Sequence, residues 1–424
     1  MKAVVIGGGL AGLAAALELA DAGHEVALLE ARPTLGGAVQ TLPEREGDPA
    51  PPPDNGQHVA LGCCTAYLSF LERIGQVSAV RRERLALPVI AEDGKVAVLG
   101  EGPVPLLRYA HISFRDRLAV ALVARRLGKL DPTAHDGETF GELLRRFGQS
   151  QAAIDHFWDV FMRPALNLGS EEASAALGIF TVKTALLSGQ GASDLLLPVK
   201  PLGEMHGGAA GRALEAAGAR VELRARVDAL EEDAAVLASG ERVPGEVFVV
   251  AVPPAECAAL LGEPAPLLED SPIVSVHLLF DRMIMRPPLA AFLGSDAHWV
   301  FDRGRLTGHE PERGQYLTVV SSGVPKLAAT RGRELVELMR RELVERLAPA
   351  ELLWSRVSRE PAATFAGRPG TAALRPGVAT GRPNVARAGA WTATGWPATM
   401  EGAIRSGRAA ARFLPVLKPS KAPA

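Results

Sequence analysis

A glycine-rich turn near the start of the chain is the first feature whose residue types and spacing point to chemistry. Gly7, Gly9 and Gly12 lie between a short apolar run and a longer one, and they match the pattern G-x-G-x-x-G. Glycine at these positions allows a tight turn, close approach of the backbone to a diphosphate, and close packing of a helix on a strand. Glu30 follows at about the spacing that brings a carboxylate to ribose hydroxyls. Together these residues predict a dinucleotide-binding site.

The elements that position this site form a strand–helix–strand unit. The apolar patterns predict a strand over residues 2–6, a helix over 10–22 and a second strand over 25–30. Further strands are predicted at 221–230, 234–238, 246–252, 273–280 and 315–321. Helices are predicted at 59–74, 106–130 and 334–347, and 139–187 is predicted to be helical with a turn near 164–170. A loop is predicted at 43–56, and a last strand, turn and helix between Pro383 and Phe413. The helix over 106–130 is expected to be largely buried, with basic ends. The fold class is therefore predicted to be α/β.

The residues after the second strand distinguish FAD from NAD. Glu30 leads through Arg32 to the glycine pair Gly36 and Gly37, and this segment resembles the corresponding one in the flavin amine oxidoreductases. In that group the paired glycines lie against an extended FAD. The resemblance therefore implies FAD as the cofactor, in a Rossmann-like FAD-binding domain with an inserted α+β substrate domain.

A second glycine-containing turn near the C-terminus is the candidate for the flavin end of the cofactor. Gly389 and Trp391 lie between the last predicted strand and the last predicted helix, and Pro397, Ala398 and Thr399 lead into that helix. In FAD proteins of this architecture the chain returns here to contact the ribityl chain and the isoalloxazine. The partial positive charge of the helix N-terminus would favour the negative charge of a reduced flavin.

Motifs spread over residues 1–410 resemble one family within the flavin amine oxidoreductases. They are Asp54-Asn55-Gly56-Gln57-His58, Phe157-Trp158-Asp159, Ala165-Leu166-Asn167, the segment 192–198, Val276-His277-Leu278, Phe280-Asp281-Arg282 and the segment 391–399. In these motifs the chain is similar to the squalene-associated FAD-dependent desaturases, the hydroxysqualene dehydroxylases of bacterial squalene and hopanoid synthesis. The resemblance implies reduction of hydroxysqualene to squalene by reduced FAD with loss of water. It also implies cofactor contacts at Gly56 and, through the backbone of a strand over 221–228, at Val227.

Three positions depart from the pattern of that family. Ala38 stands where an arginine usually follows the paired glycines, and Ala390 stands where an aspartate usually contacts the ribityl chain. Val160 replaces a common proline. The first two changes remove polar contacts to the cofactor, so we expect weaker FAD retention than in relatives that keep both residues.

The resemblance and the apolar patterns also give a domain organisation. The FAD-binding domain is predicted to be discontinuous and the substrate domain to be inserted within it. The predicted limits are 1–75, 200–265 and 375–413 for the FAD-binding domain, 76–199 and 266–374 for the substrate-binding domain, and 414–424 for a flexible tail.

The implied reaction needs a proton donor, because hydroxide is a poor leaving group, and a dry apolar surface around an allylic cation. His58 is the first candidate for the acid or polarising group, because the resemblance implies that its motif lies near the flavin and because its imidazole titrates near working pH. The alternative is a histidine that is hydrogen-bonded in the turn before a helix. Asp54 is a candidate to orient it, or else a turn or cap residue. Asp194 is a further candidate, with a helix-end cap as the alternative. His277, in the middle of a predicted strand, is interpreted as a core or sheet-face histidine, and no metal site is predicted.

Composition and charge limit the partners and the location of the protein. With 46 basic and 48 acidic residues the net charge is −2, which excludes a nucleic-acid partner. The three cysteines indicate a reducing, cytoplasmic setting. A lipophilic isoprenoid substrate further predicts peripheral association with the inner face of the membrane and contact there with squalene-synthase-like proteins. The basic residues Arg108, Arg115, Arg117, Arg125, Arg126 and Lys129 belong either to an interfacial patch for anionic lipid or to the solvated face of a buried helix.

The source of electrons and the direction of the reaction stay open at this point. A second nucleotide motif is not apparent in the sequence, so a nicotinamide cofactor would bind transiently or a partner reductase would supply electrons. One alternative function is a carotenoid or phytoene-type FAD desaturase or isomerase. Another is a non-catalytic flavin-fold lipid carrier or scaffold, which the changes at Ala38 and Ala390 keep under consideration.

Overall fold

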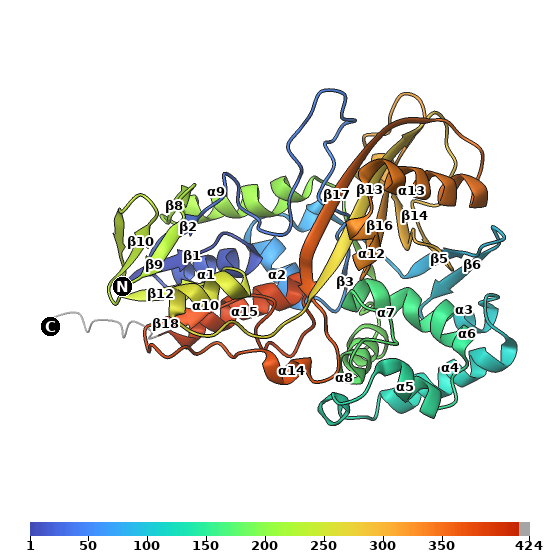
Figure 1. The fold of residues 1–424 in the computed structure, drawn as a ribbon, viewed down its shortest axis with the longest axis horizontal. Coiled ribbons are helices and arrows are strands. Elements are labelled where there is room, and N and C mark those ends of the chain that lie inside the picture. Colours follow the sequence, from blue (N-terminus) through green and yellow to red (C-terminus); the bar gives the residue numbers. More distant parts are fainter. Residues whose placement is uncertain (415–424) are drawn as a thin grey trace.

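A parallel five-stranded sheet forms one half of the molecule (Figure 1). The structure is a computed structural model that describes residues 1–414. Strand order is β18-β12-β1-β2-β8, and neighbouring strands are parallel throughout. The strands are β1 (Lys2–Ile6), β2 (Glu25–Glu30), β8 (Arg220–Leu223), β12 (Val247–Val250) and β18 (Val385–Arg387). Because β1, β12 and most of β2 are buried, their apolar runs are continuous rather than alternating, as expected for a parallel sheet covered on both faces.

Helices cover one face of this sheet, and a helix with a small sheet covers the other. The first face carries α1 (Leu10–Asp21), α2 (Thr65–Arg73), α9 (Ala209–Ala216) and α15 (Met400–Phe413), which share one apolar cluster. The second face carries α10 (Pro254–Leu261) and the sheet of β9 (Val227–Leu230), β10 (Ala234–Leu237) and β11 (Arg242–Pro244). The approach of α15 to α1 requires glycine, because a Cβ atom at Gly407 would lie 2.0 Å from the Ala11 carbonyl oxygen.

A mixed seven-stranded sheet forms the second half. Its order is β17-β13-β16-β15-β14-β5-β6, antiparallel except where β14 meets β5. The strands are β5 (Ala86–Ile90), β6 (Val96–Gly100), β13 (Asp270–Phe280), β14 (Leu289–Phe292), β15 (Trp299–Asp302), β16 (Gln315–Ser322) and β17 (Leu352–Phe365). An apolar cluster with α12 (Pro325–Ala329) and α13 (Gly332–Arg346) covers one face, and a second cluster with a group of helices covers the other.

That helical group contains one helix interrupted by a π-type turn and another that ends in one. It consists of α3 (Pro103–Arg108), α4 (Phe114–Leu127), α5 (Phe140–Arg146), α6 (Gln151–Ala153), α7 (Asp159–Leu166) and α8 (Ala175–Thr181), with π-type turns η3 (Ile154–Trp158) and η4 (Val182–Leu186) and the short 3₁₀ turn η2 (Pro132–His135). A third π-type turn, η5 (Glu204–Gly208), precedes α9. The remaining elements are η1 (Val77–Ala79), α11 (Arg303–Thr307), α14 (Thr371–Leu374) and the three-stranded sheet of β3 (Ala60–Leu61), β7 (Leu195–Pro198) and β4 (Val80–Glu83).

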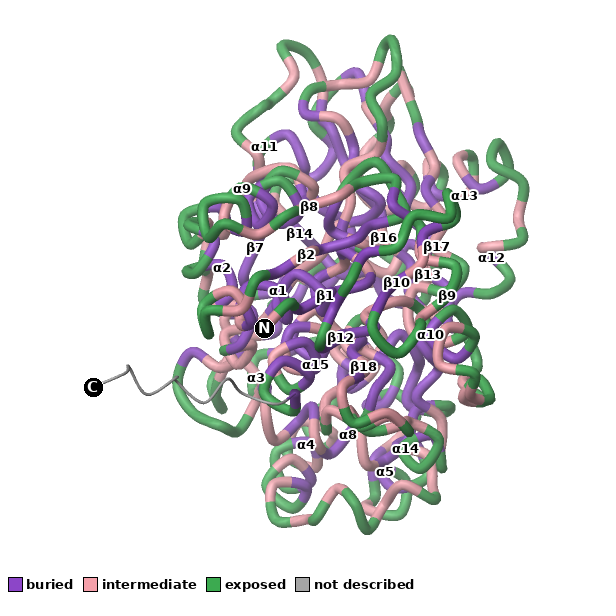
Figure 2. The backbone as a smooth tube through the Cα atoms, turned by 90° about the vertical axis from the view of Figure 1, so that its left-hand side faces the viewer, coloured by how far each residue is buried: buried purple, intermediate pink, exposed green. Residues whose placement is uncertain are grey.

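The α/β class and the Rossmann-like parallel sheet predicted from the sequence are confirmed. Every strand of the parallel sheet lies within the ranges predicted for the FAD-binding domain, and every strand of the seven-stranded sheet lies outside them. Figure 2 shows the buried residues concentrated along the central strands and inner helices, with exposed residues in the turns around them. The domain limits themselves stay a prediction.

Four local predictions are corrected by the structure. The helix predicted from residue 59 begins only at Thr65, because β3 pairs with β7 first. The strand predicted over 221–228 is broken at Arg224, whose φ is +59°, so that β8 and β9 belong to different sheets. Leu414, placed in the flexible tail, is buried against the core around α1; the rest of the predicted tail lies outside the described residues. The helix predicted over 106–130 is divided, since α3 ends at Arg108 and α4 begins at Phe114, and it is not largely buried, since Phe114 and Leu122 are strongly exposed.

Candidate active site

The glycine turn after β1 is built so tightly that only glycine fits. Gly7 has a φ of +103°, and a Cβ atom there would lie 2.4 Å from the Ala251 carbonyl oxygen. At Gly12 a Cβ atom would lie 1.8 Å from the Gly7 carbonyl oxygen. The turn delivers the chain into α1, whose N-cap Gly9 brings no capping side chain and whose first turn contains no acidic residue. The backbone N–H groups at this helix start are therefore suited to hold a diphosphate.

The second glycine pair lies directly against the first turn. The Gly36 N–H donates to the Gly8 carbonyl oxygen at 2.8 Å, and Gly36 forms a parallel bridge with Gly9. Gly37 has a φ of +61°, and a Cβ atom there would lie 2.7 Å from the Gly9 Cα atom. Gly8, Gly9, Gly36 and Gly37 thus form one backbone cradle without side-chain bulk, which fits the diphosphate of an extended dinucleotide. We call these four residues the glycine cradle.

Glu30 ends β2 beside this cradle with its carboxylate fixed by backbone donors. Its two oxygens accept hydrogen bonds from the Gly8 N–H at 2.6 Å and the Arg32 N–H at 2.7 Å. The side chain of Arg32 is exposed. The chain segment next to Glu30 is Arg224–Ala225, because the Ala225 N–H donates to the Glu30 carbonyl oxygen. Val227 lies two residues further along, at the start of β9, so its adenine contact stays a prediction.

The C-terminal turn is held to the same half of the molecule. The Gly389 N–H donates to Ser406 Oγ of α15 at 2.9 Å, and the Trp391 indole N–H donates to the Val252 carbonyl oxygen at 3.2 Å. Pro397 and Ala398 lead into α15, where Thr399 Oγ1 caps the helix by accepting from the Gly402 N–H. The structure therefore contains the strand–turn–helix that the sequence predicted, and α15 begins directly after the predicted flavin end.

Arg375, which sequence reasoning missed, organises this turn. Its guanidinium donates to the carbonyl oxygens of Ala390, Trp391, Thr392 and Trp396 and to Thr394 Oγ1. Burial lowers the pKa of Arg375 to about 10. The arginine is a cation that ties together the turn in which Ala390 replaces the expected aspartate. Ala38, the other departure, is exposed at the surface of the glycine cradle.

Two buried ion pairs fix the loop at 43–56, which precedes His58. The Asp54 carboxylate lies 2.6 Å from Arg303 of α11, and both side chains are about 2 % exposed. Asp54 also accepts from Thr41 Oγ1 at 2.7 Å and from the Leu202 N–H at 3.0 Å. Asp48 pairs with Arg356 of β17. Asp54 is therefore an anchor between the halves of the molecule, a role that the sequence did not indicate.

His58 follows this anchored loop and is partly buried. Burial lowers its pKa below the usual value of 6.5, and the nearby Asp54 carboxylate partly opposes that shift. The direction of this shift favours the neutral imidazole over the imidazolium. A neighbouring histidine, His206, interacts with the Tyr67 hydroxyl at 2.9 Å and with the Leu202 carbonyl oxygen; burial lowers its pKa to about 4.

The other predicted polar residues have structural partners. Asp194 forms an ion pair with Arg82 at 2.8 Å, next to the β3–β7 pairing, so its catalytic role stays a prediction without geometric support. His277 is fully buried in β13 and interacts with Thr318 Oγ1 at 3.0 Å, as expected for a sheet-face histidine. Gly56 lies against β13, since a Cβ atom there would come within 2.8 Å of Ser275 Oγ.

A set of half-buried apolar side chains packs against the apolar cluster that the helical group shares with the seven-stranded sheet, and its first member, Val59, directly follows His58 in the chain. Its members come from the segment after His58, from α7 and α8, and from the paired strands β15 and β16. They are Val59, Leu61, Phe161, Ala165, Leu177, Trp299 and Val320. Phe180, on α8 itself, contacts Trp396 of the C-terminal turn with ring centroids 5.1 Å apart, which links α8 to the predicted flavin end. We call this set the apolar wall.

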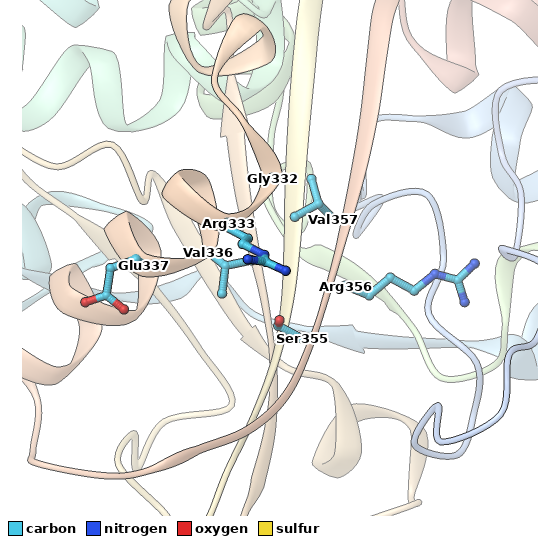
Figure 3. Close-up of a pocket in the computed structure, with 7 residues that line it drawn as sticks. All are labelled: Gly332, Arg333, Val336, Glu337, Ser355, Arg356 and Val357. Atoms are coloured by element: carbon cyan, nitrogen blue, oxygen red, sulfur yellow. The ribbon is translucent and has the colours of Figure 1, made fainter.

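A pocket between α13 and β17 is separate from this site (Figure 3). Ser355 and Val357 line it, and in the β13–β17 register they share a face with Leu278 and Val276, which pack under α13. Arg356 also lines the pocket, but its guanidinium extends away from α13 and pairs with Asp48 of the loop at 43–56. The pocket is therefore on the opposite face of the sheet from the ion pair with Asp48.

Comparison with known proteins agrees with this geometry. The family model of the flavin containing amine oxidoreductases matches residues 10–414. A hydroxysqualene dehydroxylase of Rhodopseudomonas palustris is 30% identical, with 96% of each chain covered. A 15-cis-phytoene desaturase of Narcissus pseudonarcissus is 23% identical, covering 98% of this chain and 79% of its own. The solved structure of an oxidoreductase from Methanosarcina mazei has a TM-score of 0.75 at 18% identity, with 96% and 99% covered.

The chain therefore belongs to the flavin-containing amine oxidoreductase family, and its cofactor is FAD. The uncapped start of α1, the glycine cradle and the fixed Glu30 carboxylate fit the nucleotide half of that cofactor. Within the family, the full-length similarity to a hydroxysqualene dehydroxylase confirms the resemblance that the sequence motifs indicated.

Proposed function

We propose that this protein reduces hydroxysqualene to squalene in bacterial squalene and hopanoid synthesis. The observation that carries the proposal is the position of His58, a partly buried imidazole that directly precedes Val59 of the apolar wall and lies near the Asp54 carboxylate. An apolar substrate with one hydroxyl group needs such a surface, with one polar group at the carbon that reacts. The hydroxysqualene dehydroxylase relative supports the choice of substrate.

The residues of the chain would each serve a separate part of this reaction. Bound reduced FAD supplies hydride to the substrate carbon. His58 donates a proton or a hydrogen bond to the hydroxyl group, which leaves as water. The apolar wall excludes other nucleophiles from the allylic cation. Asp54 lies close enough to raise the pKa of His58. Its carboxylate oxygens, however, accept hydrogen bonds from Arg303, Thr41 and Leu202, so Asp54 positions the loop rather than moving the proton.

An anaerobic assay tests the function directly. Enzyme holding chemically reduced FAD is incubated with hydroxysqualene, and squalene is the expected product. Unchanged alcohol, together with desaturation of a carotenoid precursor by the oxidised enzyme, would instead establish the desaturase alternative that the phytoene desaturase relative suggests. The same assay with a reduced nicotinamide in place of the chemical reductant tests whether that cofactor supplies electrons.

Replacement of His58 with alanine is expected to lower turnover by about 10²–10⁴-fold while FAD stays bound, because a general acid contributes that much. If imidazolium is the donor, turnover should increase as the pH falls from 8 toward 6, because the pKa of His58 lies below its usual value. His309→Ala, at an exposed histidine, is the matched control. Turnover of His58→Ala equal to that of the control would remove His58 from the mechanism.

A further inference from the structure

The surface formed by α3, α4 and β6 exposes an unusual amount of apolar side chain. Of the fifteen large hydrophobic residues that are strongly exposed in residues 1–414, eight belong to it or adjoin it. They are Val96 and Val98 of β6, Val104 and Leu107 of α3, Phe114, Leu118 and Leu122 of α4, and Leu187, whose Cδ1 lies 3.0 Å from a Cβ atom built at Gly128. We call these residues the α3–α4 surface. A concentration of this kind marks an interaction site.

The apolar stripe on α4 is not used for packing within the chain. Phe114, Leu118 and Leu122 are spaced four residues apart and so share one helix face, with exposed fractions of 62%, 46% and 70%. The residues that bury α4 in the protein, Val120, Val123 and Leu127, lie on the opposite face. The helix is therefore apolar on two sides, and one of those sides lacks a partner within the described chain.

Basic residues surround the stripe. The sequence of α4 contains four arginines and one acidic residue, Asp116, which caps the helix start together with Ser113. The side chains exposed on or beside the surface are Arg108, Arg115, Arg125, Arg126 and Lys129. On a helical wheel Arg125 falls within the stripe, and Arg115 and Arg126 flank it on one side. An apolar stripe with a basic border is the pattern of an interfacial helix.

We propose that the α3–α4 surface docks the protein on an anionic lipid bilayer, with Phe114, Leu118 and Leu122 inserted at the level of the headgroups and the arginines among the lipid phosphates. A second copy of this chain fits the surface less well. A twofold contact would place the same arginines opposite one another, and like charges in an interface are unfavourable.

Docking at this surface would also give the protein access to a membrane-dissolved substrate. This consequence rests on the proposed function. The buried face of α4 belongs to the same apolar cluster as the apolar wall. A bilayer at α3–α4 would therefore bring the helical group, which contributes Phe161, Ala165 and Leu177 to the wall, to the source of a hydrocarbon substrate. The docking itself can be measured without turnover.

Vesicle sedimentation of the FAD-loaded protein tests the proposal. Binding is expected to phosphatidylcholine vesicles that contain phosphatidylglycerol, to weaken on addition of salt, and to be much weaker with phosphatidylcholine alone. Leu122→Asp should lower the partition coefficient about tenfold, and Arg125→Gln and Arg126→Gln about fivefold each. Leu267→Asp, at an apolar residue 83% exposed outside this surface, is the matched control and should bind as the unchanged protein does.

Three outcomes would overturn the proposal. The first is that Leu122→Asp binds vesicles as well as the unchanged protein does. The second is that Leu267→Asp loses as much vesicle binding as Leu122→Asp. The third is that the protein forms a homodimer in solution which Leu122→Asp dissociates, while neither form binds vesicles. Detergent-dispersed hydroxysqualene separates docking from function. A Leu122→Asp variant that loses vesicle binding but converts dispersed substrate normally supports both proposals. An unchanged protein that binds vesicles and converts nothing contradicts the function alone.

Discussion

Replacement of Asp54 with alanine is expected to destabilise the folded protein by about 3–5 kcal/mol, the usual effect of removing one partner from a buried ion pair. Arg303 would remain buried and charged, with a side chain only 2% exposed, and two further donors to Asp54 would lose their acceptor. The change should appear as a lower midpoint in denaturant unfolding, with and without added FAD.

A control and a double variant make this test specific. Asp21→Ala removes an ion pair with Arg73 whose side chains are 50% and 35% exposed, so a loss of at most about 1 kcal/mol is expected. Combining Asp54→Ala with Arg303→Met removes the uncompensated charge and should recover part of the stability. An unfolding midpoint for Asp54→Ala no lower than that of Asp21→Ala would show that the buried pair does not hold the two halves together.

Replacement of Gly12 with alanine is expected to weaken FAD binding by about 10- to 100-fold. The new Cβ atom would lie 1.8 Å from the Gly7 carbonyl oxygen, so α1 must shift away from the turn predicted to hold the diphosphate. Overpacking of this kind costs about 1–3 kcal/mol, and tenfold in affinity corresponds to about 1.4 kcal/mol. The purified variant should have lost flavin absorbance, which added FAD restores only at high concentration.

Gly137→Ala is the matched control for this variant, because nothing lies within 4 Å of a Cβ atom built there. It should keep FAD as the unchanged protein does. If Gly12→Ala also retains its flavin through gel filtration, the turn after β1 is not the diphosphate site. The prediction of weaker retention caused by Ala38 and Ala390 is separate, and restoring an arginine or an aspartate at those positions would test it.

Local sequence determined the nucleotide half of the site. The pattern from Gly7 to Gly37 is contained in one continuous strand–helix–strand segment, and its glycines are required by backbone contacts within that segment and to the end of β12. Local backbone contacts of this kind require glycine at fixed spacings, which can be recognised in the sequence. The C-terminal turn and α15 were predicted for the same reason.

The strands of the substrate half were harder to predict. β17 runs over fourteen residues, but its sequence includes Arg356, Arg359, Glu360 and Pro361, which are not typical of a strand. The strand is stabilised by long-range pairing with β13, which its own residue pattern does not indicate. For α4 the error was of another kind. The apolar run was recognised, but sequence does not show whether an apolar face meets a core or lies at the surface.

The sequence by itself thus determined the class of the protein, its cofactor and the glycines predicted to hold the diphosphate, because these depend on residues close together in the chain. Only the tertiary structure decided the role of the polar residues around the reaction site. Asp54 meets Arg303 across 249 positions, and Arg375 meets a turn that begins 15 residues further on. Such pairs form because an unpaired buried charge is unfavourable. The spacing of residues in the sequence does not show which distant residue will pair with that charge.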